Sequence, residues 1–149
     1  MSAIKTVPEG MEYTVERFGR YLKTIKPGLT LVVPFIDKIG YKVNMRERKV
    51  YVEFTELKTK DNAEIKGDAD IYLTVSDTYK LAYETGDSDV NIRQKCDMEM
   101  KILAKTMTVE AILTSADKID ETLLSLIKSR ESDWGLRVRY IDVHKIYLA

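Results

Sequence analysis

The first half of the chain alternates apolar and polar residues with the period of two that is typical of β-strands. Pro and Gly separate short segments of this kind at residues 13–17, 21–25, 29–33, 41–44 and 49–54. Pro34 follows the third segment and ends it, because proline cannot donate to a strand ladder. In the last segment Val50, Val52 and Phe54 alternate with polar neighbours, which predicts one buried face and one exposed face.

The longest alternation runs over residues 63–75, after a polar turn at 59–62. It predicts one continuous, half-exposed antiparallel strand of thirteen residues. The face that we expect to be buried comprises Ala63, Ile65, Gly67, Ala69, Ile71, Leu73 and Val75. Gly67 and the two alanines leave that face thin, so a helix or another strand is expected to approach closely there.

After residue 75 the apolar spacing changes to three and four, which indicates helices. Ser76 is predicted to cap a short helix that runs through Tyr83, and Ser88 a longer one that reaches Met107. One more helical turn is expected at 109–113, and Asp117 is predicted to cap a further helix that ends near 134–135. The inward residues of this last helix are expected to be Ile119, Leu123, Leu126 and Ile127.

A final strand is predicted from Leu136 to Leu148, with a bulge near Ile141. The order of elements predicts a single α+β domain over residues 1–149. Its β-rich N-terminal lobe would cover about 1–58, and an α/β lobe with antiparallel strands and two to four helices would cover 59–149.

Charge and composition exclude several function classes. Lys plus Arg equals Asp plus Glu at 24 each, so no overall field favours nucleic acid. One cysteine and one histidine allow neither an internal disulfide nor a Cys/His zinc site, and we expect no metal and no cofactor. The longest apolar run is far below the ~20 residues of a membrane-spanning helix. We therefore expect this chain alone to be soluble.

The residues that could serve catalysis do not form a known constellation. No serine or cysteine lies in a nucleophile motif, and Gly-rich phosphate loops are absent. His144 is predicted to be an ordinary residue of the last strand. The pairs Asp68/Asp70 and Asp87/Asp89 lack a third ligand in the sequence. These observations predict a protein that is not an enzyme.

The apolar run at residues 29–36 is the strongest candidate for a binding site. Its possible membrane contacts are Leu29, Leu31, Val32, Val33, Phe35 and Ile36, and the residues expected to meet lipid headgroups are Lys23, Lys26 and Lys38. A second interpretation is that Leu31, Val33 and Phe35 alternate into the β core. The sequence leaves both interpretations open.

The helix at 88–107 carries Met98, Met100 and Met107, which are candidates for contacts between subunits because methionine adapts to imperfect surfaces. The alternative is that these methionines belong to the core of the same chain. Cys96 lies among them and is expected to be a small buried apolar residue.

Five motifs carry a resemblance to a known family. They are VPEG (7–10), ERFGRY (16–21), KPGLTLVVPFIDKIG (26–40), VNMRER (43–48) and TKDN (59–62), with looser matches at 70–72, 112–114 and 134–135. Together they resemble the stomatin/prohibitin (SPFH, band 7) domain, in its stomatin-like subgroup. The resemblance is specific over the first 62 residues and covers nearly the whole chain.

This resemblance implies a non-enzymatic, membrane-associated scaffold domain that self-associates and organises membrane microdomains and partners such as proteases or ion channels. An alternative is a soluble interaction module that regulates a protease or channel without touching lipid. Family members typically have an apolar anchor before the VPEG-like motif and a coiled coil after the last strand. Neither is expected within residues 1–149, so membrane association, on the non-secreted face, is expected of the full-length protein.

Overall fold

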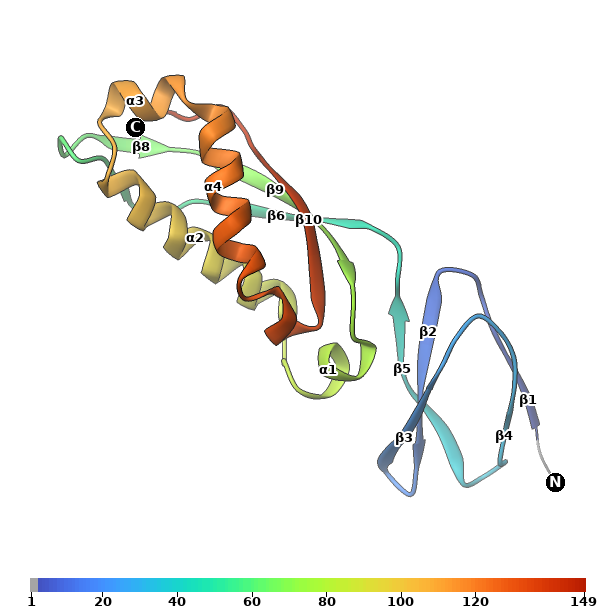
Figure 1. Cartoon of the computed structure of the whole chain (residues 1–149). Coiled ribbons are helices and arrows are strands. Elements are labelled where there is room, and N and C mark those ends of the chain that lie inside the picture. Colours follow the sequence, from blue (N-terminus) through green and yellow to red (C-terminus); the bar gives the residue numbers. More distant parts are fainter. Residues whose placement is uncertain (1–2) are drawn as a thin grey trace.

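The computed structural model describes residues 3–149, except the side chains of Ala3 and Ala116. The fold is α+β, as predicted, with an N-terminal lobe of strands and a second lobe of strands and helices (Figure 1). The first lobe comprises β1 (Ala3–Val7), β2 (Met11–Arg17), β3 (Arg20–Ile25), β4 (Gly28–Val32) and β5 (Asp37–Asn44).

The N-terminal lobe consists of two small antiparallel sheets. β1 pairs with β4, and β2 lies between β3 and β5. Val7, Val15, Ile25 and Val32 form the small core between them. Val32 is only 5% exposed, whereas its neighbour Leu31 lies on the outer side of the ribbon, opposite Ile4. The interpretation that Leu31 alternates into the core is therefore wrong. In β4, Val32 is buried and Leu31 is exposed.

The second lobe contains the remaining elements. Its strands are β6 (Arg48–Glu53), β7 (Leu57–Lys58), β8 (Glu64–Lys66), β9 (Asp68–Val75), β10 (Leu136–Val143) and β11 (Tyr147–Leu148). Its helices are α1 (Thr78–Tyr83), α2 (Ser88–Lys105), α3 (Val109–Thr114), α4 (Ala116–Lys128) and the 3₁₀ turn η1 (Glu131–Trp134). Helices α2 and α4 cover one face of the sheet β10-β9-β6, and the opposite face is open (Figure 1).

The strand predicted at 63–75 is two strands, because the chain changes partners at Gly67. β9 pairs with β6 and β10, whereas β8 pairs with β7 and β11. The predicted inner face is confirmed, since Ile65, Ala69 and Ile71 are buried. The close approach at Gly67 is confirmed, but it comes from a loop residue and not from a helix or strand: an added Cβ atom would lie 3.2 Å from Cγ1 of Ile146, between β10 and β11.

Two predicted helix caps are wrong by one residue. Asp77 caps α1 and accepts from the Lys80 N–H, and Asp87 caps α2 by accepting from the N–H groups of Asp89 and Val90. Each aspartate is the last extended residue before its helix, and its carboxylate also opposes the positive end of the helix dipole. Ser76 and Ser88 therefore do not cap these helices.

The last predicted helix is shorter than expected, and Asp117 does not cap it, because it lies in the first turn of α4 and Ser115 occupies the N-cap position. α4 ends at Lys128, and η1 ends at Gly135, whose φ of 65° reverses the chain toward β10. Ile119, Leu123 and Ile127 are buried as predicted, whereas Leu126 is exposed.

The predicted final strand also differs in detail. The register shift lies between Val138 and Tyr140, slightly before the predicted position, and β10 stops at Val143. Because β6 pairs with β9, the boundary between the lobes lies between Asn44 and Arg48 and not near residue 58.

A tyrosine of α1 fixes the first lobe against the second. The Tyr83 hydroxyl donates to Oε2 of Glu16 at 2.6 Å and contacts Oγ1 of Thr14 at 2.9 Å. Its ring also meets the ring of Tyr41 edge to face, at 5.1 Å between centroids. Because Glu16 and Thr14 lie on β2 and Tyr41 on β5, this contact holds the central strand pair of the N-terminal lobe.

We expect neighbouring substitutions in β4 to separate core from surface. Val32→Ser should lower the free energy of unfolding by about 2 kcal/mol, because it removes buried methyl groups and buries a hydroxyl. Leu31→Ser should change it by less than about 0.5 kcal/mol. Urea denaturation of both variants measures this difference, and equal losses would contradict the assignment of Val32 to the core.

Candidate functional site

Two turns of the N-terminal lobe place phenylalanine at a backbone conformation that favours asparagine or glycine. Phe18 and Gly19 join β2 to β3 with φ values of 53° and 78°. Positive φ at both central residues is the type I′ hairpin turn, for which Asn-Gly is the preferred pair. Phe35, in the turn between β4 and β5, has a φ of 66°. Both rings are exposed, Phe18 to 80% and Phe35 completely.

The pairing of β2 with β5 brings these turns side by side. Arg17 lies opposite Asp37 in the register, and the two side chains form a bidentate pair with N–O distances of 2.7 and 3.1 Å. Asp37 also accepts from the Val33 N–H at 2.9 Å. The Arg17 guanidinium and this amide lower the pKa of Asp37 to about 2, so the carboxylate stays charged at neutral pH.

Further exposed apolar residues lie at the same end of the lobe. Ile4 and Leu31 are directly paired across the β1–β4 ribbon, and Ile36 precedes Asp37. Figure 1 shows the β2–β3 turn, the β4–β5 turn and the start of β1 together at the lower end of the lobe. We call the set Ile4, Phe18, Leu31, Phe35 and Ile36 the apolar tip.

The predicted membrane contacts differ in their exposure to solvent. Leu31, Phe35 and Ile36 belong to the apolar tip, and Leu29 is exposed further along the outer side of β4. Val33 is partly buried. Val32 is a core residue and is corrected accordingly, since its side chain faces Val7 and Val15. The sequence reasoning missed Phe18 and Ile4, although a phenylalanine beside glycine in a hairpin turn was a signal.

The predicted lysines are all exposed but do not lie together. Lys38 follows Asp37 directly, and Lys23 is near enough to Asp37 to contribute to its low pKa. Lys26 follows the far end of β3, six residues and therefore roughly 20 Å from the Phe18 turn. Lys26 thus lies away from the apolar tip, whereas Arg20, at the base of the Phe18 turn, is exposed beside it.

The three methionines of the second lobe have different surroundings. Met100 is completely buried among Ile92, Cys96 and the rest of the main core, and Met107 packs partly against that core. Met98 is 53% exposed and shares an outer stripe of α2 with Val90 and Ile102. Met100 is therefore corrected from a subunit contact to a core residue.

Cys96 is buried, as predicted. Burial raises the pKa of its thiol to about 12, so the unreactive thiol form persists at neutral pH.

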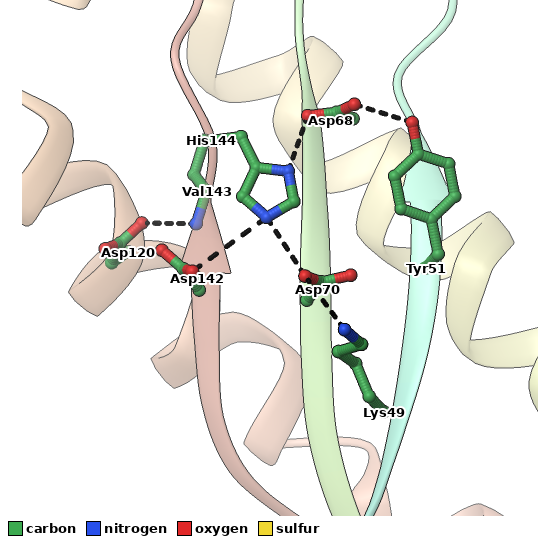
Figure 2. Close-up of polar contacts among 8 residues, drawn as sticks. All are labelled: Lys49, Tyr51, Asp68, Asp70, Asp120, Asp142, Val143 and His144. Carbon is green, nitrogen blue, oxygen red and sulfur yellow. Dashed lines mark hydrogen bonds and ion pairs between the residues drawn. The ribbon is translucent and has the colours of Figure 1, made fainter.

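His144 lies in a polar cluster that the sequence did not reveal. It follows β10, where its Nδ1 is 2.8 Å from Oδ1 of Asp68 and its Nε2 is 3.0 Å from Oδ2 of Asp70 (Figure 2). The Tyr51 hydroxyl donates to Oδ2 of Asp68 at 2.6 Å. Asp142 lies further away, 3.9 Å from Nε2. The expectation that His144 is an ordinary strand residue is therefore wrong.

This cluster is partly exposed at His144 and Asp68, whereas Asp70 is buried. Asp68 lines a cavity of about 730 Å³ whose lining does not include His144. Ligand atoms of Asp70, Asp142 and His144 lie within 4.8 Å of one another, but these groups already contact each other and nothing further indicates an ion. The cavity beside His144, of about 540 Å³, is lined by apolar residues and Lys145, without a carboxylate. Among the described residues, His144 and the carboxylates thus do not converge in a pocket. Within residues 3–149, no helix combines the length and apolar character needed to cross a bilayer.

Comparison with known proteins identifies one family over almost the whole chain. Residues 5–149 match the family described as SPFH domain / Band 7 family. An uncharacterised protein of Mycobacterium tuberculosis is 31% identical over 144 residues, which is 97% of this chain and 38% of that protein.

Two relatives have names that contain the word stomatin. A stomatin-like protein of Caenorhabditis elegans is 28% identical over 147 residues, 99% of this chain and 45% of its own length. Human mitochondrial stomatin-like protein 2 is 24% identical over 142 residues, 95% of this chain and 40% of its own length. The chain therefore spans less than half the length of these three relatives.

Replacing Phe18 by asparagine should stabilise the protein. Asparagine tolerates left-handed backbone, so Phe18→Asn should raise the free energy of unfolding by about 1 kcal/mol and lose no buried contact. Urea denaturation measures the change, with Phe18→Tyr as a control that keeps a ring and should leave stability unchanged. A lower stability for the asparagine variant would show that the ring packs against the protein.

Proposed function

This chain belongs to the SPFH domain / Band 7 family, and from that premise we propose that it is the membrane-contacting, self-associating domain of a non-enzymatic scaffold. Its partners would be membrane proteins, such as proteases or channels, that the assembly organises or regulates. Stomatin-like proteins among its relatives support this class of function. The localisation that follows is the membrane surface, reached in the full-length protein.

The apolar tip is the observation that carries the membrane part of this proposal. Five exposed apolar side chains gather at one end of the lobe, and two of them lie on left-handed backbone that costs of order 1–3 kcal/mol each. If these two turns had only a structural role, asparagine would be the preferred residue at both positions. Exposed apolar residues that are kept despite this cost in stability indicate a surface that binds another apolar surface.

Basic residues at the base of the tip support contact with an anionic lipid surface. Arg20, Lys23 and Lys38 are exposed there, and each could add about 1 kcal/mol near a negatively charged bilayer. Arg17 is already paired with Asp37 and serves the geometry of the turns. We leave Val32, which is in the core, and Lys26, which is remote, out of the contact surface.

Liposome flotation tests this contact with variants that keep the fold. Phe18→Asn/Phe35→Asn should reduce partitioning onto vesicles with anionic lipid by at least about tenfold. Full burial of each ring would contribute about 1.5–3 kcal/mol, and 1.4 kcal/mol corresponds to a factor of ten. The matched control is Leu113→Ser/Leu148→Ser, which removes two exposed apolar side chains from the second lobe and should float like the parent protein.

The outcomes separate the two interpretations of function. Loss of flotation in the asparagine variant, with the control unaffected, supports the membrane scaffold. Equal flotation of all three proteins would contradict contact through the tip. A parent protein that does not float would favour the alternative, an interaction module without lipid contact.

Self-association is proposed through the outer stripe of α2. Val90, Met98 and Ile102 recur at multiples of four residues, so they lie along one side of the helix. All three are exposed, and none belongs to the core of the second lobe. Surrounding ion pairs such as Lys95–Glu99 border this stripe with charge, as the rim of an interface would.

We expect Met98→Asp/Ile102→Asp to abolish concentration-dependent assembly, because the carboxylates would be desolvated in the contact. Analytical ultracentrifugation over a hundredfold concentration range, in the presence of vesicles or detergent micelles and in their absence, measures this assembly. Leu148→Asp is the control for an added exposed charge. Unchanged assembly of the double variant would exclude this face of α2.

A further inference from the structure

His144 lies where the main sheet of the second lobe gives way to its smaller sheet. β10 ends at Val143, and Gly67 separates β8 from β9 on the neighbouring chain segment. The backbone N–H of His144 donates to the Asp68 carbonyl at 2.9 Å, beyond the last residue pair of β10 with β9. Three residues later, Tyr147 begins the pairing of β11 with β8, opposite Lys66.

Both ring nitrogens of His144 face carboxylate oxygens, which accept but do not donate while they are ionised. Neutral imidazole carries one N–H, so only one of the two contacts can be a hydrogen bond in that state. If Nδ1 keeps its proton for Asp68, the lone pair of Nε2 faces Asp70 at 3.0 Å and is repelled. Imidazolium donates to both carboxylates. The geometry therefore fits the protonated ring.

We propose that His144, Asp68 and Asp70 form a proton-operated latch. When His144 is protonated it ties the end of β10 to the start of β9 and holds β11 against β8; when it loses its proton, the contact with Asp70 breaks and β11 loosens. The ligand that regulates this site is a proton, which binds to the imidazole ring of His144. The latch is independent of the membrane contact, because the β11 end of the chain lies far from the apolar tip (Figure 1).

The charges around the ring favour its protonation. Three carboxylates face the ring: Asp68 and Asp70 on β9 and Asp142 on β10 (Figure 2). Lys49 and Tyr51 on β6 contact Asp70 and Asp68, and Asp120 on α4 contacts the backbone of Val143. The aspartates outnumber the one lysine, whose Nζ is 3.9 Å from Oδ2 of Asp70. Asp120 accepts from the Val143 N–H at 3.0 Å and so holds the residue before His144 in place.

Proton binding at His144 stabilises the folded state. The hydrogen bond with Asp68 raises the pKa of His144 above its usual 6.5, and the Asp70 charge adds to this. A pKa that is raised by folding adds stability below pH 6.5, and that stability is lost as the pH rises through the folded-state value. The Tyr51 and His144 hydrogen bonds lower the pKa of Asp68, so the latch persists in acid until the pH falls below 3.8. The latch is closed in weakly acidic solution, and it opens when the pH rises above the folded-state pKa of His144.

The packing around the latch indicates what its opening would release. Ile146 fills the space over Gly67 and is buried, whereas Tyr147 and Leu148 are exposed. The Ala149 N–H donates to the Glu64 carbonyl at 3.0 Å, which ends the β11 pairing. With so short a strand and few buried side chains, residues 146–149 depend on the latch for their position.

The chain has a single histidine, which makes the protonation state directly measurable. A nitrogen NMR titration of the unmodified protein, in EDTA to exclude adventitious cations, should show both ring nitrogens protonated at pH 6.5 and a midpoint above that value. Asp70→Asn should move the midpoint back toward 6.5. A neutral ring at pH 6.5, or a midpoint at or below it, would overturn the proposal.

Hydrogen exchange then tests the consequence for β11. Protection factors of the amides at 144–149, corrected for intrinsic exchange rates, should fall between pH 6 and pH 9 by about tenfold for each unit by which the His144 pKa exceeds 6.5. His144→Gln should show low protection at both pH values, and the amides of α2 serve as the internal control. Equal protection at both pH values in the parent protein would overturn the latch.

Discussion

The Arg17–Asp37 pair holds the functional end of the N-terminal lobe together. It joins the last residue of β2 to the first residue of β5, directly beneath both phenylalanine turns. It adds a side-chain link to the backbone pairing of β2 with β5, which already places the two turns side by side. Because the guanidinium keeps the pKa of Asp37 at about 2, the pair remains ionised over the physiological pH range. This ion pair beneath the apolar tip is therefore insensitive to pH changes within the physiological range.

The two lobes differ in how they treat large apolar residues on left-handed backbone, although Glu56 in the second lobe also has a positive φ of 52°. In the second lobe aspartates cap α1 and α2, glycine ends η1, and branched apolar residues fill the sheet. In the N-terminal lobe two large rings lie on left-handed backbone in water. Natural sequences depart from local preference chiefly at functional sites, and the larger hydrophobic core of this protein lies in the second lobe. The hydrogen bond of Tyr83 with Glu16 connects the two lobes, because it attaches β2 to α1.

The proposed activities lie at separate places on the molecule. The apolar tip lies at one end, the β11 segment at the other, and the exposed stripe of α2 on the helical side of the second lobe (Figure 1). A copy of this chain that meets a bilayer through its tip would leave α2 free for a neighbour. The position of residues 146–149 would depend on His144. Membrane contact, assembly and the position of residues 146–149 would thus be separable by substitution.

Periodicity alone determined the fold class, strands β2 to β6, the buried face of residues 65–75 and the apolar face of α2, because these depend on the order of neighbouring residues. It missed β1 and β7. The motifs of the first 62 residues also identified the family. Tertiary structure alone decided which side of β4 is buried, since alternation gives two faces and only the position of Val7 and Val15 selects one. It likewise decided the split at Gly67, where a change of partner strand leaves the alternation unbroken. The His144 cluster joins residues more than seventy positions apart, and such a contact leaves no local pattern in the sequence.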